Sequence, residues 1–132
     1  MSFNEPFDPF MDHLGIRVVE SSPGTVVMTI TPGPEHLNLG GIVHGGLLST
    51  LMDSATGWAL HTTLPAGSTP PHLAVSYRFL SMAHPATELT ATATVLKTGT
   101  TIGHVHVEIH DTSNRLIATG ETTHAIVALP PR

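Results

Sequence analysis

The chain has 132 residues and a formal net charge of −5, and 40% of its residues are hydrophobic while only 11% are charged. A chain of this length suits one domain with a substantial core. An average soluble domain carries roughly 25% charged residues, so much of this surface is weakly polar, which indicates that other subunits cover part of it. Five Lys and Arg residues are too few for the basic face that nucleic-acid binding requires.

The sequence contains no cysteine, which excludes disulfides, thiolate chemistry and cysteine-built metal sites. Residues 1–10 lack the basic start and apolar run of a signal peptide. No apolar stretch approaches the roughly 20 residues that cross a bilayer. We therefore expect a single domain over residues 1–132, located in the cytoplasm, with neither nucleic acid nor a membrane as partner.

The first thirty residues predict a short helical segment followed by a hairpin. Residues 3–11 place aromatic side chains at helix-like spacing among prolines, which favours a helical turn or an arm packed on the body. Apolar side chains alternate along 14–19 and again along 25–31, the pattern of half-buried strands. Residues 22–24 (Ser-Pro-Gly) supply the turn that joins them.

The only long helical pattern covers residues 44–61, and a loop rich in Pro and Gly follows over 64–71. Four further strands are predicted over 73–79, 88–97, 101–111 and 116–128. Short polar turns between these strands indicate antiparallel neighbours. Six strands that do not alternate with helices exclude a doubly wound parallel sheet and predict an antiparallel α+β domain around one long helix.

The predicted helix has one apolar side and one polar side when each residue advances by about 100°. Six apolar residues within an arc of about 120° should pack on the sheet: Leu47, Leu48, Leu51, Ala55, Trp58 and Ala59. Asp53 projects from nearly the opposite side, where the neighbouring side chains are small or carry hydroxyls: Ser49, Thr50, Thr56 and Gly57.

Asp53 has two interpretations. An aspartate on the polar face of a helix is most often a solvated surface residue. However, Asp is a poor residue for a helix interior, and Asp53 is the only charged residue between Glu35 and Arg78. A lone carboxylate among hydroxyls therefore favours a crevice.

Gly45 and Gly46 open the helix, where two glycines cost stability. One explanation is that bare backbone lets a ligand approach the free N–H groups of the first turn, at the positive end of the helix dipole. Such an arrangement polarises a carbonyl. The other explanation is a tight loop-to-helix junction that needs glycine dihedrals, and the sequence does not separate the two.

Gly45 and Asp53 lie eight residues apart, hence about 12 Å along one helix. One helix cannot bring both groups to a single reacting carbonyl. Two antiparallel copies of the helix across a two-fold axis would place the glycine end of one beside the aspartate of the other. Catalysis by these groups therefore predicts a homodimer with two shared sites, and the low charge favours a dimer of such dimers.

The spacing of Asn38, the triplet His44-Gly45-Gly46 and Asp53 resembles the hot-dog fold acyl-CoA thioesterases of the phenylacetate-pathway (PaaI-like) and 4-hydroxybenzoyl-CoA types. The resemblance extends over nearly the whole chain. It implies a six-stranded curved antiparallel sheet wrapped around one long central helix. The implied activity is hydrolysis of an aryl- or acyl-CoA thioester to the free acid and CoA, with no cofactor besides the CoA of the substrate.

The same resemblance assigns catalytic roles. Asp53 would be the nucleophile or the general base, and the Gly45 N–H of the partner subunit would polarise the thioester carbonyl. His44 and Asn38 would order the loop and support the reacting groups. Substrate-binding roles fall on Gly46, Thr56, Gly57, His72, Ser76, Arg78 and Lys97. The chain has only five Lys and Arg residues. Among them, Arg78 and Lys97 are the candidates for the CoA phosphates, given their places in the second half of the sheet.

One position departs from the family pattern. Relatives often carry Ser or Thr near the start of the strand after the helix, where it contacts the carboxylate or the attacking water. Here His72 stands at that position, and Ser76 follows four residues later. Either His72 takes the role of the hydroxyl or the activity is reduced or lost.

Two rival functions remain. His104, His106, Glu108 and His110 share one face of a predicted strand, and His-x-His is a metal-binding spacing. That face is otherwise the polar side of the strand or a subunit contact. The second rival is a hot-dog domain that binds acyl-CoA without hydrolysing it, against which the complete set of Asn38, His44, Gly45 and Asp53 argues.

Overall fold

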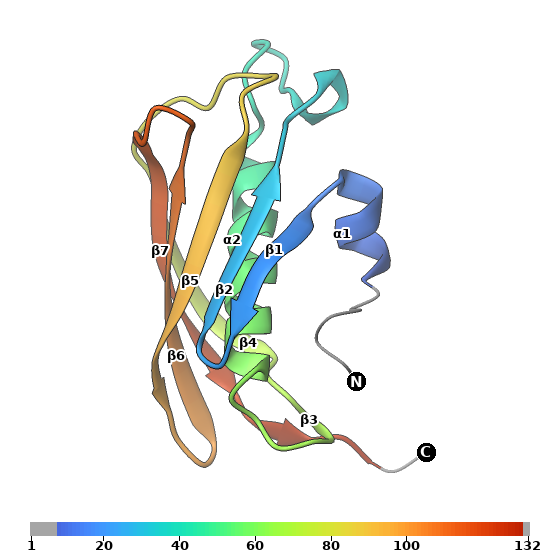
Figure 1. Cartoon of the computed structure of the whole chain (residues 1–132), viewed down its shortest axis with the longest axis vertical. Coiled ribbons are helices and arrows are strands. Elements are labelled where there is room, and N and C mark those ends of the chain that lie inside the picture. Colours follow the sequence, from blue (N-terminus) through green and yellow to red (C-terminus); the bar gives the residue numbers. More distant parts are fainter. Residues whose placement is uncertain (1–7, 131–132) are drawn as a thin grey trace.

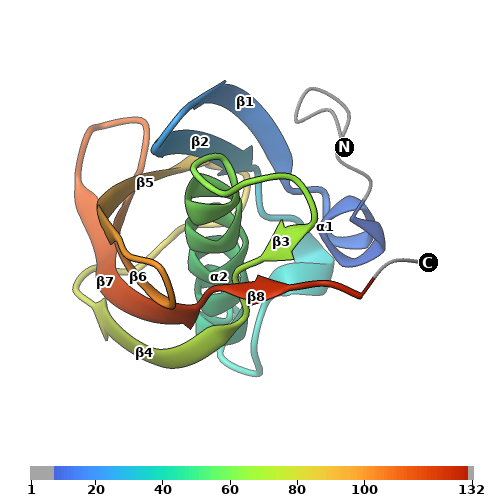
Figure 2. The same cartoon turned by 90° about the horizontal axis from the view of Figure 1, so that it is seen from below.

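The computed structural model describes residues 8–130 and shows a curved antiparallel sheet around one long helix (Figures 1 and 2). The strands lie in the order β1-β2-β5-β6-β7-β4. Their bounds are Arg17–Ser22 (β1), Thr25–Ile30 (β2), His72–Phe79 (β4), Leu89–Thr98 (β5), Ile102–His110 (β6) and Leu116–Ala125 (β7). The predicted α+β architecture with a six-stranded antiparallel sheet is confirmed.

The long helix, α2 (Gly45–His61), runs through the concave side of the sheet, and Figure 2 shows it inside the curve. Its buried side packs on β2, β5 and β6. Small side chains allow close approach, because Ala55 and Ala59 on the helix and Ala91 and Ala93 on β5 are all fully buried. Within residues 8–130, no helix is long and apolar enough to cross a membrane.

The buried side of α2 is wider than the sequence predicted. Eight residues are buried: Leu47, Leu48, Leu51, Met52, Ala55, Thr56, Ala59 and Leu60. At about 100° per residue they cover roughly 220° of the helix surface instead of about 120°. The curved sheet encloses the helix on its flanks, so Thr56, expected on the polar side, has no exposed surface. Trp58, expected against the sheet, is half-buried at the rim and lines a pocket.

Several element boundaries also differ from the predicted ones. A capped helix, α1 (Pro9–Leu14), ends at Gly15, so the first strand begins three residues later than expected. The segment predicted as the strand 116–128 divides into β7 and a short β8 (Val127–Ala128). The latter pairs with β3 (Ser68–Thr69), inside the segment predicted as loop. A single turn of 3-10 helix, η1 (Pro34–His36), precedes α2. The predicted arm over 3–7 lies outside the described residues.

Gly120 on β7 is required by the packing of its neighbour strand. A Cβ at this position would lie 2.5 Å from Cδ1 of Tyr77 and 3.1 Å from the carbonyl oxygen of Ser76. We therefore expect Gly120→Ala to lower the free energy of unfolding by about 1–3 kcal/mol, since overpacking forces side chains and backbone to shift. Urea unfolding measures the loss. The adjacent, exposed Glu121→Ala is the control, and equal stability of the two variants would contradict the prediction.

Candidate active site

The loop before α2 is folded by the side chain of Asn38. Its Oδ1 accepts hydrogen bonds from the N–H of Gly40 at 2.9 Å and of Ile42 at 3.3 Å. The backbone of Asn38 closes the same turn, donating to the Ile42 carbonyl at 2.8 Å. Gly41 takes a φ of +77°, a left-handed conformation that favours glycine. With Oδ1 used by the loop, only the side-chain nitrogen of Asn38 is left to face other groups.

His44 is the N-cap of α2, and its Nδ1 accepts a hydrogen bond from the Gly46 N–H at 2.8 Å. A Cβ on Gly46 would lie 2.9 Å from that nitrogen, so Gly46 makes room for the cap. Gly45 is different, because a Cβ there would meet nothing within 4 Å. Neither glycine has a left-handed φ, and within residues 8–130 the Gly45 N–H has no acceptor. Neither steric contact nor backbone conformation within the described chain therefore requires glycine at position 45.

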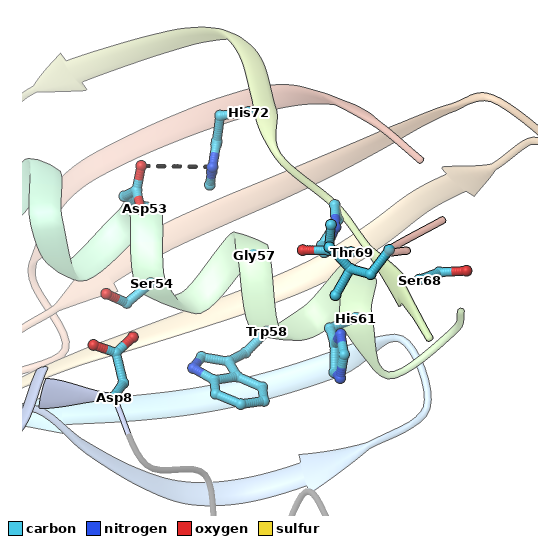
Figure 3. Close-up of a pocket in the computed structure, with 11 residues that line it drawn as sticks. Asp8, Asp53, Ser54, Gly57, Trp58, His61, Ser68, Thr69 and His72 are labelled. Atoms are coloured by element: carbon cyan, nitrogen blue, oxygen red, sulfur yellow. Dashed lines mark ion pairs between the residues drawn. The ribbon is translucent and has the colours of Figure 1, made fainter. Parts of the chain in front are cut away.

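Asp53 lies at a pocket of about 370 Å³ along the outer side of α2 (Figure 3). The pocket is lined by Asp8, Asp53, Ser54, Gly57, Trp58, His61, Ser68, Thr69, Pro70, His72 and Leu129. The Asp53 side chain is 57% exposed. The carboxylate thus occupies a crevice, as one of the two interpretations predicted, but at its open mouth. A separate hollow of about 560 Å³ surrounds Asn38 and His44 at the other end of the helix.

The structure brings His72 to Asp53. In Figure 3 the imidazole reaches from the start of β4 toward the carboxylate, with His72 Nδ1 3.6 Å from Asp53 Oδ2. On its other side, His72 Nε2 lies 3.0 Å from Thr56 Oγ1. Burial lowers the pKa of His72, while the Asp53 carboxylate acts in the opposite direction. His72 therefore belongs to the same site as Asp53.

Sequence reasoning missed His124, which is fully buried beneath His72. The two rings have centroids 4.1 Å apart. Nδ1 of His124 donates to the Pro70 carbonyl at 2.9 Å, so Nε2 accepts from the Thr122 hydroxyl at 2.7 Å. Burial is the main cause that lowers the pKa of His124. The pairing of β4 with β7 places the two histidines opposite each other, a long-range register that local patterns do not reveal.

Tyr77 on β4 is a second group near the site that the sequence did not single out. Its hydroxyl is buried and has no hydrogen-bond partner within residues 8–130. Burial raises the pKa of Tyr77 far above its ordinary value, and the nearby Asp53 carboxylate adds to the shift. The phenol consequently stays protonated and is a potential donor beside Asp53.

Four of the predicted substrate-binding residues lie away from the pocket, and the first of them, Gly46, is in the opening turn of α2. Ser76 is exposed on β4 and lines a separate hollow of about 230 Å³. Arg78 is exposed further along β4, and Lys97 is exposed at an irregularity in the pairing of β5 with β6. Their roles stay predictions. By contrast, Gly57 lines the pocket, and Thr56 reaches it indirectly through His72.

The histidine face of β6 is linked by contacts between its own polar side chains and to the neighbouring strand β7. His106 Nε2 lies 2.9 Å from Glu108 Oε2, and His110 Nε2 lies 3.7 Å from Glu108 Oε1. His104 contacts the Thr123 hydroxyl at 3.2 Å. In the described part of the chain, no three His, Asp or Glu side chains are arranged to hold a metal ion.

Comparison with known proteins identifies the family of the chain. Residues 40–118 match the model of the thioesterase superfamily. The chain belongs to that superfamily. Human acyl-coenzyme A thioesterase 13 is 32% identical over 109 residues, which cover 82% of this chain and 77% of the relative. Membership confirms the predicted family and makes the chain a thioester hydrolase.

Solved structures give the same result for the fold. The E. coli PaaI protein from the phenylacetic acid degradation operon superposes with a TM-score of 0.85 at 28% identity, covering 92% of this chain and 87% of that one. AziG of S. sahachiroi superposes with a TM-score of 0.87 at 28% identity, covering 92% and 98%. The predicted hot-dog fold is confirmed.

The buried His124 makes a testable contribution to stability. Because its pKa is lowered from 6.5 in the folded chain, the unfolded chain binds more protons as the pH falls below that value. Stability is therefore full above about pH 6.5 and declines in more acidic solution. We expect His124→Gln, which cannot titrate, to reduce the difference in unfolding free energy between about pH 7.5 and about pH 5.5.

Urea unfolding at the two pH values measures this difference. The matched control is His84→Gln, which removes an exposed histidine and should keep the wild-type pH dependence. If His124→Gln retained the full acid destabilisation, another group would have to be its source.

Proposed function

We propose that this chain hydrolyses acyl-CoA thioesters in sites shared by two copies of the chain. Asp53 of one subunit acts as nucleophile or general base, and the Gly45 N–H of the partner subunit polarises the thioester carbonyl. The observation that carries the proposal is the unused Gly45 N–H, which has no acceptor within residues 8–130 and no neighbour that would clash with a side chain.

The separation of the two groups supports the shared site. The eight residues between Gly45 and Asp53 correspond to about 12 Å of helix, and Asp53 lines one pocket while His44, the residue before Gly45, lines a separate hollow. A backbone N–H at a helix N-terminus stabilises the negative charge that develops on a carbonyl oxygen. A carboxylate can attack a thioester carbon or activate a water for the attack. An antiparallel pair of α2 helices would bring these two functions together twice.

The free edge of the sheet supports the homodimer. β4 is an edge strand of eight residues, and its exposed side chains include Leu73, Val75 and Phe79, each about half or more exposed. Long apolar edges of this kind invite pairing with another strand. A second copy of β4 would cover it and continue the sheet. The weakly polar outer face and the low charge of the chain favour a dimer of such dimers.

The substrate follows from family and pocket. The human relative is named an acyl-coenzyme A thioesterase. The acyl group would enter the pocket at Asp53, where Trp58, Pro70 and Leu129 supply apolar surface. Gly57 lines this pocket, Thr56 supports it through His72, and Gly46 belongs to the first turn of α2 beside the Gly45 N–H. The exposed Arg78 and Lys97 are candidates for the CoA phosphates. The reaction needs water but no additional cofactor.

Hydrolysis itself is the first test. We expect the purified protein to release free thiol from members of a panel of aryl- and acyl-CoA thioesters. Asp53→Asn should lower kcat by roughly 10²–10⁴-fold, because an amide can neither attack nor accept the proton. Asp12→Asn, an exposed carboxylate on α1, is the matched control. Binding of acyl-CoA without turnover would instead identify a binding domain.

The shared site has a separate test at Gly45. Proline is accepted at the first residue of a helix, and His44 already has the extended dihedrals (φ −64°, ψ 133°) that a residue before proline adopts. Gly45→Pro therefore removes the N–H while preserving the helix, whereas Gly45→Ala keeps the N–H. We expect Gly45→Pro to be inactive and Gly45→Ala to retain activity.

Mixing the two inactive variants then distinguishes shared sites from separate ones. A heterodimer of Asp53→Asn and Gly45→Pro chains contains one site without either change. After random subunit exchange, about one quarter of all sites are intact, so about one quarter of the wild-type activity should return. No recovery despite exchange confirmed by mass spectrometry would exclude the shared arrangement.

A further inference from the structure

The two nitrogens of the His72 ring face different partners, and Thr56 determines which nitrogen carries the proton. The Thr56 hydroxyl lies 2.8 Å from the Met52 carbonyl oxygen and 3.1 Å from the Asp53 carbonyl oxygen. Carbonyl oxygens only accept, and the contact to the Met52 carbonyl is the shortest of the three that the hydroxyl makes, so we assign the single hydroxyl hydrogen to that carbonyl. The third contact, 3.0 Å from Oγ1 to His72 Nε2, is then one in which Nε2–H donates to the hydroxyl oxygen.

His72 Nδ1 is consequently an unprotonated acceptor in the neutral ring, and it faces a second acceptor. Asp53 Oδ2 lies 3.6 Å away, beyond hydrogen-bond distance, and this tautomer has no hydrogen between the two atoms. A molecule with two donors matches such a pair. A water that donates one hydrogen to each acceptor keeps its lone pairs directed away from both, toward the open side of the pocket.

The surroundings of His72 hold the ring in this state. Its titratable neighbours are Asp53 on α2, His124 on β7 and, beside the same carboxylate, Tyr77 on β4. Burial lowers the pKa of His72 and outweighs the opposing carboxylate. His124 is hydrogen-bonded through both nitrogens as a neutral ring, and it packs against His72 at 4.1 Å. A neutral His72 at neutral pH follows.

We propose that His72 Nδ1 and Asp53 Oδ2 together hold the hydrolytic water, so that hydrolysis requires a neutral His72. This inference rests on the proposed thioesterase function and assigns Asp53 the role of general base. As the water oxygen attacks the thioester carbon, one of its protons passes to the Asp53 carboxylate. The other O–H still donates to His72. The C–S bond then breaks, and the departing CoA thiolate takes the proton from Asp53, giving the free acid and the thiol.

A histidine in this position adds a pH dependence that a hydroxyl would lack. Once protonated, Nδ1–H donates to Asp53 and closes an ion pair where the water was held. We therefore expect kcat/KM to fall about tenfold per pH unit below the pKa of His72 in the free enzyme. Intrinsic Trp58 fluorescence at each pH checks that the chain stays folded.

Variants test whether this fall of kcat/KM in acid, the acid limb of the pH profile, arises from His72. His72→Ser keeps a group that can accept from water but does not titrate, so the variant should hydrolyse more slowly and lack the limb. His61→Gln removes the other histidine of the pocket and should keep the limb, whatever its effect on the rate. Thr56→Val removes the acceptor for Nε2–H and should weaken catalysis through kcat. Persistence of the full limb in an active His72→Ser would overturn the proposal.

A measurement on the wild-type protein tests the same proposal without any variant. Long-range ¹H–¹⁵N spectra of the histidine side chains report which ring nitrogen is protonated, and we expect His72 to carry its proton on Nε2 at neutral pH. A proton on Nδ1 would overturn the water-holding role even if His72→Ser failed to fold. Failure of the thioesterase function is recognised separately, because the wild type would then turn over no thioester.

Discussion

The enclosure of α2 by the sheet is the constraint on which the rest of the structure depends. Eight buried residues fix the helix over its whole length, so its N-terminus and Asp53 are held at a set separation of about 12 Å. The first turn leaves the Gly45 N–H without an acceptor within residues 8–130, whereas Asp53 opens into the pocket further along the helix. Under the proposed mechanism, the rigid packing that stabilises the fold also keeps the Gly45 N–H and Asp53 of one chain from reaching the same carbonyl.

Local periodicity predicted most of the fold, because the pattern of each element reports its own burial. The alternation along β2 appears directly as alternating buried residues, and the helix begins one residue after the predicted start. The width of the buried arc could not be predicted in this way. It depends on how far the sheet curves around the flanks that carry Thr56 and Met52, and that curvature is set by contacts among distant strands. The two-residue strands β3 and β8 are likewise too short for a periodic pattern.

The candidate site likewise contains residues that local sequence patterns reveal and residues that only long-range strand pairing brings together. His44 as N-cap and Asn38 as organiser of the loop act on neighbouring residues, so a short motif that resembles a known family was sufficient to single them out. His72 and His124 are 52 residues apart and meet only because β4 pairs with β7 in the register His72↔His124. An irregularity after His72 shifts that register by one residue before Ala74. A local pattern contains no information about such a shift, and this is why His124 was missed.

His72 and His124 link the stability of this chain to its proposed chemistry. Burial lowers the pKa of both His72 and His124, and a neutral ring is what each position requires. At His124 the neutral ring satisfies Pro70 and Thr122; at His72 it leaves Nδ1 as an acceptor toward Asp53. Low pH disfavours both neutral rings, because protonation of either imidazole places a positive charge where water solvates it poorly. In the proposed mechanism, a histidine at position 72 makes catalysis depend on the same desolvation that makes the fold sensitive to acid, and relief of one without the other requires separating two rings whose centroids lie 4.1 Å apart.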